Sequence, residues 1–135
     1  MSKRTFIVFG IFVVALVVAI PWLVFNGKGD AKSGAQDVPA KYESGQELFQ
    51  INCGNCHELY SAGTDGNYGP DLDELMAPGG PLAGDAVKSA EGRVLNAIEN
   101  GVDGTSTPGR MPAEILNDTQ AKEVAAFVAN TAGEG

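Results

Sequence analysis

The sequence predicts an all-α fold in which one apolar N-terminal helix precedes a small helical domain. Two stretches, 90–100 and 117–128, repeat apolar residues at the three- and four-residue spacing of a buried helix face. Residues 6–25 carry no charge, which is typical of a helix that crosses a membrane. No run of alternating β-branched residues indicates a sheet. The expected domains are an anchor at 1–25, a flexible linker at 26–41 and a helical domain at 42–135.

The N-terminal segment is expected to be an uncleaved membrane anchor. Residues 6–25 form a twenty-residue stretch without charge, long enough to cross about 30 Å of hydrocarbon as a transmembrane helix. Lys3 and Arg4 precede it, and Trp22 lies where an aromatic belt would meet the far interface. A cleaved signal peptide is the alternative, but its apolar core is usually shorter, about 7–15 residues. The nearest small-residue cleavage pattern, at 33–35, lies well beyond the apolar stretch.

Residues 26–41 are expected to form a flexible linker. They are rich in Gly, Ala, Lys and Asp and have no apolar periodicity. A linker of this length has a root-mean-square span of roughly 20–25 Å, enough for a tethered domain to reach neighbouring sites. Ordering against a partner subunit is the alternative that composition leaves open.

The expected domain at 42–135 is strongly acidic. It contains four basic and fifteen acidic residues, a net charge of −11, against −8 for the whole chain. Such a charge repels nucleic acid and anionic lipid headgroups and steers the domain toward basic protein surfaces. A merely soluble acidic surface explains it equally well. No nucleic-acid partner is therefore expected.

The domain is expected to contain three main helices separated by long loops. The first covers about 43–52, and a Gly-, Pro- and Asp-rich stretch with a short helix at 72–76 comes after it. The second spans 90–100 and ends at Gly101, in the position of a left-handed C-terminal cap. The third begins at Asn117, because a glutamine three residues later completes a capping box.

The most informative motif is C-x-x-C-H at residues 53–57. The chain holds only two cysteines and one histidine, and all three lie in this run. The spacing is typical of covalent haem attachment, in which each thiol adds across one haem vinyl group. Cys53 and Cys56 would then hold one haem c, with His57 as the proximal ligand of its iron.

A C-x-x-C pair also occurs in thioredoxin-like redox sites, zinc sites and small disulfides. A zinc site needs four ligands, and the sequence has no second Cys/His pair. A thioredoxin-like site needs a βαβ context, which the sequence does not indicate. A plain disulfide leaves the adjacent His57 unexplained. Haem attachment is therefore the favoured interpretation.

Met111 is favoured as the distal ligand of the iron. Met1 belongs to the expected anchor, so Met76 and Met111 are the candidates. Pro112 biases Met111 toward an extended backbone, and Gly109 permits a close approach to the haem. Met76 lies on or near the short helix, where core packing is the usual role of methionine.

With these residues in place, the domain resembles a class I (mitochondrial-type) cytochrome c in its bacterial, membrane-anchored form. The resemblance covers most of residues 43–131 and includes the attachment run, Gly69-Pro70 and Met111-Pro112. The first helix also resembles the family in the small and aromatic pair that meets three apolar residues of the last helix. These five residues are Gly45, Phe49, Val124, Phe127 and Val128.

The resemblance implies six-coordinate iron with His57 and Met111 as axial ligands. It also implies that the Pro70 carbonyl accepts a hydrogen bond from the other ring nitrogen of His57, which would fix the imidazole and raise its basicity. The Met111 thioether would raise the reduction potential because it favours ferrous iron. Covalent haem attachment implies the extracytoplasmic side of a bacterial cytoplasmic membrane, with a cytoplasmic N-terminus and a periplasmic haem domain.

These features predict a membrane-anchored carrier of single electrons, and not an enzyme. With both axial positions filled, no site remains for a small-molecule substrate, and no Ser/His/Asp, paired-carboxylate or phosphate-binding constellation is present. Asp71, Asp73 and Glu74 are interpreted as a solvated loop or a helix start. The expected partners are respiratory or photosynthetic complexes, such as a quinol-oxidising complex and a terminal oxidase or reaction centre. A fixed subunit of such a complex and a haem-based ligand sensor are the alternatives.

Overall fold

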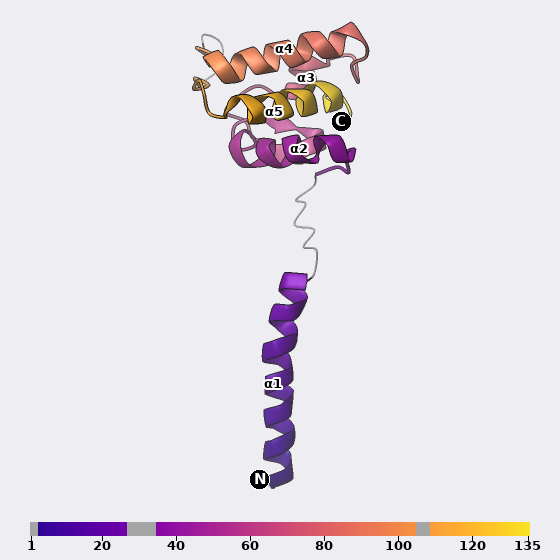
Figure 1. Ribbon diagram of the computed structural model, residues 1–135, viewed down its shortest axis with the longest axis vertical. Coiled ribbons are helices and arrows are strands. Elements are labelled where there is room, and N and C mark those ends of the chain that lie inside the picture. Colours follow the sequence, from indigo (N-terminus) through magenta and orange to yellow (C-terminus); the bar gives the residue numbers. More distant parts are fainter. Residues whose placement is uncertain (1–2, 27–34, 105–108) are drawn as a thin grey trace. The chain divides into compact units, whose positions relative to one another are not determined.

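The computed structural model describes residues 3–26, 35–104 and 109–135, and within the first helix it describes the side chains of Arg4 and residues 7–22. The chain divides into two compact units, Met1–Lys32 and Ser33–Gly135. Figure 1 labels the α-helices of both units.

The first unit is built on one helix, α1, which spans Lys3–Asn26. Pro21 lies inside this helix, and every side chain described in it is exposed. Among the described residues, no helix combines the length and the apolar character needed to cross a membrane. The helix expected at 6–25 is therefore present, and its membrane crossing stays a prediction.

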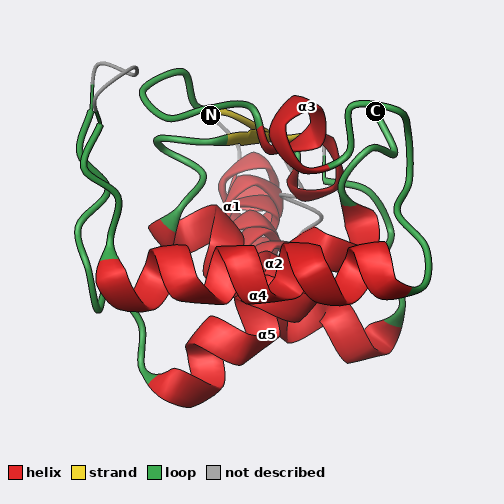
Figure 2. Cartoon of the chain, turned by 90° about the horizontal axis from the view of Figure 1, so that it is seen from above, coloured by secondary structure: helices red, strands yellow, loops and turns green. Residues whose placement is uncertain are grey.

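The second unit is a bundle of three main helices, as the sequence predicts. They are α2 (Ala40–Asn52), α4 (Asp85–Asn100) and α5 (Asp118–Thr131). Helix α5 packs against both α2 and α4 and lies between them in Figure 1. The shorter elements are β1 (Glu58–Leu59), the 3-10 helix η1 (Tyr60–Ala62), β2 (Thr64–Asp65) and α3 (Leu72–Met76). Figure 2 shows α3 and the two strands on one side of α4 and α5.

The helix boundaries differ from the predicted ones where the sequence lacks an apolar stripe. Helix α2 begins at Ala40, three residues before the predicted start, directly after Pro39. Helix α4 begins at Asp85 instead of residue 90, because its first turn is mostly exposed and so does not extend the buried apolar stripe. Helix α3 covers the predicted 72–76.

The expectation of no sheet was wrong in a small way. Strands β1 and β2 have two residues each and pair in antiparallel fashion, with Glu58 opposite Asp65 and Leu59 opposite Thr64. A segment of two residues is too short to show the alternation by which a strand is recognised in a sequence.

Both predicted helix caps fall at the expected residues. Asn117 Oδ1 accepts hydrogen bonds from the backbone of Thr119 and Gln120, and Gln120 Oε1 accepts one from the Asn117 N–H. This is the predicted capping box. Gly101 ends α4 with φ 70° and ψ 177°, so its φ is positive as expected while its ψ is extended instead of left-handed helical.

The core is organised around the crossing of α2 and α5. The rings of Phe49 and Phe127 meet edge to face, with centroids 6.0 Å apart. A Cβ atom placed on Gly45 would meet the Glu123 carbonyl oxygen and lie 2.7 Å from Cβ of Phe127. Glycine at position 45 therefore lets the two helix backbones approach closely enough for the two rings to pack.

The C-terminal end of the predicted linker is tied to the helical unit. The buried Gln46 side chain donates to the carbonyl oxygens of Gln36, at 2.8 Å, and Ser61, at 2.7 Å. The Gln36 N–H also donates to Ser61 O. Residues 27–34 of that linker lie outside the described residues. The flexible linker predicted for 26–41 therefore does not extend through its last residues, because Gln36 is hydrogen-bonded and α2 already begins at Ala40.

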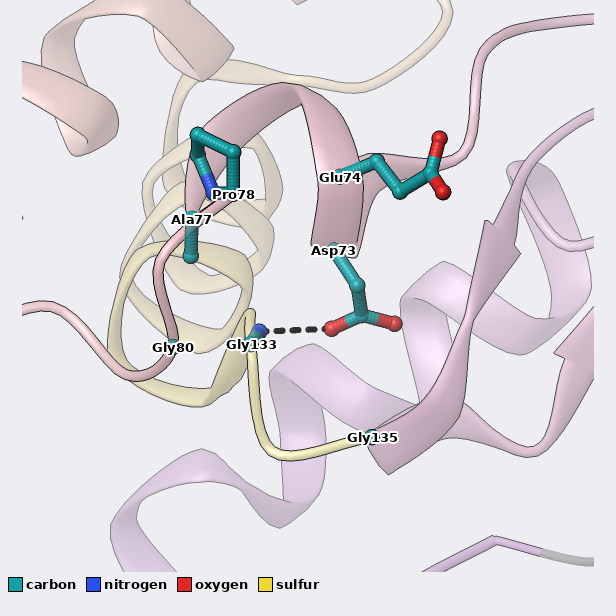
Figure 3. A pocket seen from close by; sticks show the side chains of 7 residues that line it. All are labelled: Asp73, Glu74, Ala77, Pro78, Gly80, Gly133 and Gly135. Carbon is teal, nitrogen blue, oxygen red and sulfur yellow. Dashed lines mark hydrogen bonds between the residues drawn. The ribbon is translucent and has the colours of Figure 1, made fainter.

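The acidic run at 71–74 has structural roles, as Figure 3 shows for one of its members. Asp71 caps α3 by accepting from the backbone of Asp73 and Glu74, which confirms the helix-start interpretation for Asp71. Asp73 instead accepts hydrogen bonds from Tyr60 N and Gly133 N, both at 2.7 Å. Its carboxylate thus joins three segments: α3, the first residue of η1, and the chain just after α5.

We predict that Gly45→Ala lowers the free energy of unfolding by about 1–3 kcal/mol, because the added methyl group overpacks the α2–α5 crossing. Gly92→Ala is the matched control: Gly92 lies within α4, and a Cβ there would meet nothing within 4 Å. It should raise stability by about 0.5–1 kcal/mol, since alanine favours helix. Denaturant unfolding of the two holoproteins measures both values. Equal stabilisation by both substitutions would contradict the tight crossing.

Candidate haem site

The attachment motif lies in a tight turn that begins where α2 ends. Cys53 is the C-cap of α2, and its N–H donates to Phe49 O at 2.8 Å. The N–H groups of Cys56 and His57 both donate to Cys53 O at 3.0 Å. These bonds fold residues 53–57 into a tight turn. The end of helix α2 therefore fixes the backbone positions of both cysteines and of His57.

The two cysteines have different surroundings. Neither forms a disulfide; Cys53 is buried and Cys56 is exposed. Burial raises the pKa of the Cys53 thiol to about 11, and the neighbouring Cys56 adds to the rise. A thiol in such a setting stays neutral near pH 7, so the inner sulfur contributes no charge to the core.

The ring of His57 is held by one backbone carbonyl. Its Nδ1 lies 2.9 Å from Pro70 O. Because a carbonyl oxygen can only accept, the neutral ring carries its proton on Nδ1 and keeps the lone pair on Nε2. The contact that the resemblance implied between His57 and Pro70 is present, and it leaves the second ring nitrogen able to bind a metal.

The loop between β2 and α3 wraps closely around the motif. A Cβ on Gly69 would lie 2.7 Å from His57 Nδ1, and one on Gly66 would lie 2.6 Å from His57 N. Gly69 N–H donates to Cys56 O at 2.7 Å, and Thr64 Oγ1 donates to His57 O at 3.0 Å. The roles of Thr64 and Gly66 could not be seen in the sequence, because neither residue belongs to a recognisable motif and both act only through the fold.

Met111 is fixed by its backbone. It forms an isolated antiparallel bridge with Val102, in which each N–H donates to the other's carbonyl at 3.0 Å. A Cβ on Gly101 would lie 2.7 Å from Met111 O, so the glycine permits this approach. The side chain of Met111 is half-buried against the core. The extended backbone expected for Met111 is therefore observed.

Met76, the other candidate ligand, ends α3 and is also half-buried against the core. Burial therefore does not separate the two methionines. Their backbones do, because Met76 lies at the end of a helix and Met111 lies in an extended bridge.

The residues present fit a covalent haem. The chain offers two thiols for thioether bonds, one imidazole nitrogen with a free lone pair, and a methionine sulfur. These are the protein groups that hold haem c and its iron. In the part of the chain that the structure describes, no group of three or more His, Cys, Asp or Glu side chains is arranged to hold a metal ion.

Comparison with known proteins agrees with this site. Residues 42–132 match the family model for cytochrome c, which is more than half of the chain, so the chain belongs to the cytochrome c family. It is similar to the crystal structure of the c-type cytochrome SorU from Sinorhizobium meliloti, with 35% identity and a TM-score of 0.52 over 69% of this chain and 92% of that one. No significant match was found among curated proteins.

Family membership defines the class of protein and its cofactor. The chain is a c-type cytochrome that binds haem c covalently, with iron as the metal. The two cysteines that such a bond requires are both present in the sequence.

We predict that Gly69→Ala raises the reduction potential, because its methyl group would press on the His57 ring and weaken the bond to Pro70 that makes the imidazole more basic. Gly79→Ala is the control, since a Cβ at Gly79 would meet nothing within 4 Å. Redox titration of both holoproteins gives the comparison. A Gly69→Ala potential equal to that of the control would show that this contact does not influence the iron.

Proposed function

We propose that this protein is a membrane-anchored single-haem cytochrome that carries single electrons between redox complexes. The observation that carries the proposal is the His57–Pro70 contact of 2.9 Å, which orients an imidazole with a free Nε2 beside two cysteines. Bound haem supplies the iron that alternates between ferrous and ferric states. The chain's own residues attach that group, set its potential and limit access to it.

Four side chains divide these tasks. Cys53 and Cys56 hold the haem through thioether bonds, one from a buried and one from an exposed position. His57 serves as the proximal ligand through Nε2. Met111 serves as the distal ligand, and its soft sulfur favours the ferrous state and so raises the potential. With His57 and Met111 both holding the iron, no position would remain for a small-molecule substrate, and the haem would supply electron transfer without bond formation.

The proposed anchor is the apolar segment 6–25, with the N-terminus in the cytoplasm and the haem domain in the periplasm of a bacterium. Its support is the absence of charge over twenty residues, with Lys3 and Arg4 before them. The helix α1 contains this segment, and the apolar side chains described in it are exposed. An anchor would keep the carrier close to membrane-bound partners.

The proposed partners are redox complexes with basic docking surfaces, such as a quinol-oxidising complex on one side and a terminal oxidase or reaction centre on the other. The net charge of −11 over residues 42–135 supports this charge preference. Opposite charge speeds encounter and loses its effect as salt concentration rises.

We predict that Met111→Ala abolishes the Fe(III)–methionine charge-transfer absorption and lowers the reduction potential, because the iron loses its thioether ligand. Met76→Ala is the matched control, and it should keep the absorption while costing about 1–2 kcal/mol of stability, since a half-buried methionine mainly contributes packing. Absorption spectra and redox titrations of both holoproteins test the assignment. Loss of the absorption in Met76→Ala alone would make Met76 the ligand.

Rapid carbon monoxide binding by the reduced wild type would instead favour a ligand sensor.

We predict that the full chain fractionates with membranes and leaves them only with detergent. After extraction, a carrier should migrate as a single cytochrome in gel filtration, whereas a fixed subunit would copurify with its complex. A variant that lacks residues 6–25 but receives a cleavable export signal is the control and should appear in the soluble periplasmic fraction. Release of the full chain by salt alone would contradict the anchor.

A further inference from the structure

Tyr68 connects the loop that holds the His57 ring to the loop that carries Met111. It directly precedes Gly69 and Pro70, the residues that enclose and hydrogen-bond the His57 ring. Its own ring lies against Gly109, two residues before Met111. A Cβ placed on Gly109 would come into contact with Tyr68 Cε1 and lie 2.7 Å from Cζ. The tyrosine ring therefore fills the space that a side chain at position 109 would need.

The Met111 segment is thus restrained from two directions. On one side, the paired hydrogen bonds to Val102 hold the backbone of Met111 itself. The adjacent ion pair between Arg110 Nε and Asp103 Oδ1, at 2.9 Å, is exposed and adds little. On the other side, the ring of Tyr68 covers Gly109, a residue whose backbone would otherwise have the most conformational freedom.

We propose that Tyr68 is a positioning residue for the distal ligand, because it joins the loop that holds His57 to the loop that carries Met111. This inference rests on the proposed role of Met111. The ring limits the conformations of Gly109 and thereby raises the fraction of time for which the Met111 sulfur is on the iron.

The contribution of Tyr68 to ligand positioning is separable from a contribution to folding. Tyr68 is 52% exposed, and it lies outside the apolar core and the side chains packed on that core. Removing its ring should therefore cost little stability. The effect expected is local, on the equilibrium between bound and released Met111.

Imidazole binding to the ferric holoprotein measures this equilibrium. Imidazole can bind the iron only when Met111 is released, so its apparent dissociation constant falls in proportion to the rise in the released fraction. For Tyr68→Ala we expect at least about tenfold tighter binding and a weaker Fe(III)–methionine charge-transfer absorption, with an unchanged unfolding midpoint. Tenfold corresponds to about 1.4 kcal/mol in the Met111 equilibrium. Tyr68→Phe keeps the ring and should bind imidazole as the wild type does.

Two further variants complete the design. Gly109→Ala should reproduce the effect of Tyr68→Ala, because its methyl group and the tyrosine ring cannot share the same space. Tyr60→Ala is the matched control: Tyr60 is a similarly exposed tyrosine, at 48%, and its ring lies near Gly135 instead of Gly109. It should bind imidazole like the wild type.

The outcomes separate this inference from the proposed function. If Met111→Ala keeps the charge-transfer absorption, Met111 is not the ligand, and its proposed role falls together with the positioning role of Tyr68. If Met111→Ala loses the absorption while Tyr68→Ala and Gly109→Ala bind imidazole within about twofold of the wild type, only the positioning role of Tyr68 is overturned. An equal change in Tyr60→Ala would also overturn it, because the effect would then be general to exposed tyrosines.

Discussion

The arrangement of the site depends on one hydrogen bond, between His57 Nδ1 and the Pro70 carbonyl, 2.9 Å long. This bond decides which ring nitrogen carries the proton, and so which one is available to iron. It also joins the attachment motif to the loop before α3, where Gly69 lies close to the imidazole ring. Because a carbonyl cannot donate, the orientation of the ring follows from backbone geometry and requires no charged neighbour.

The helical scaffold fixes the position of the motif that makes this contact. The motif starts at the C-cap of α2, and α2 is locked onto α5 by Gly45 and by the packed rings of Phe49 and Phe127. Contacts outside the apolar core hold the loops that carry the other site residues. Asp73 fastens α3 to Tyr60 and Gly133, while Val102 and Tyr68 restrain the segment of Met111. Although the chain is rich in glycine, its site is well defined, because hydrogen bonds and side-chain contacts hold the loops that form it.

Local patterns predicted much of this arrangement, and non-local contacts account for the rest. The attachment motif, the capping box at Asn117 and the short helix α3 could be recognised from adjacent residues, as could the extended backbone of Met111 before a proline. Three features have no periodic signal in the sequence. They are the early start of α4, the pairing of β1 with β2, and the hydrogen bond from Gly133 to Asp73. The contact of Tyr68 with Gly109 joins residues 41 positions apart in the sequence, so no local rule could identify it. The resemblance to a known family supplied the role of Pro70, which sequence spacing alone does not reveal.

The most direct test of this account is extraction of the purified, natively matured protein with acidified organic solvent. Covalent attachment through Cys53 and Cys56 predicts that the haem stays with the wild-type polypeptide, whereas the haem of a variant with both cysteines replaced by alanine passes into the solvent. Intact mass spectrometry of the wild type should show one haem added to the polypeptide. A wild-type protein that is colourless, or that releases its haem into the solvent, would contradict the account.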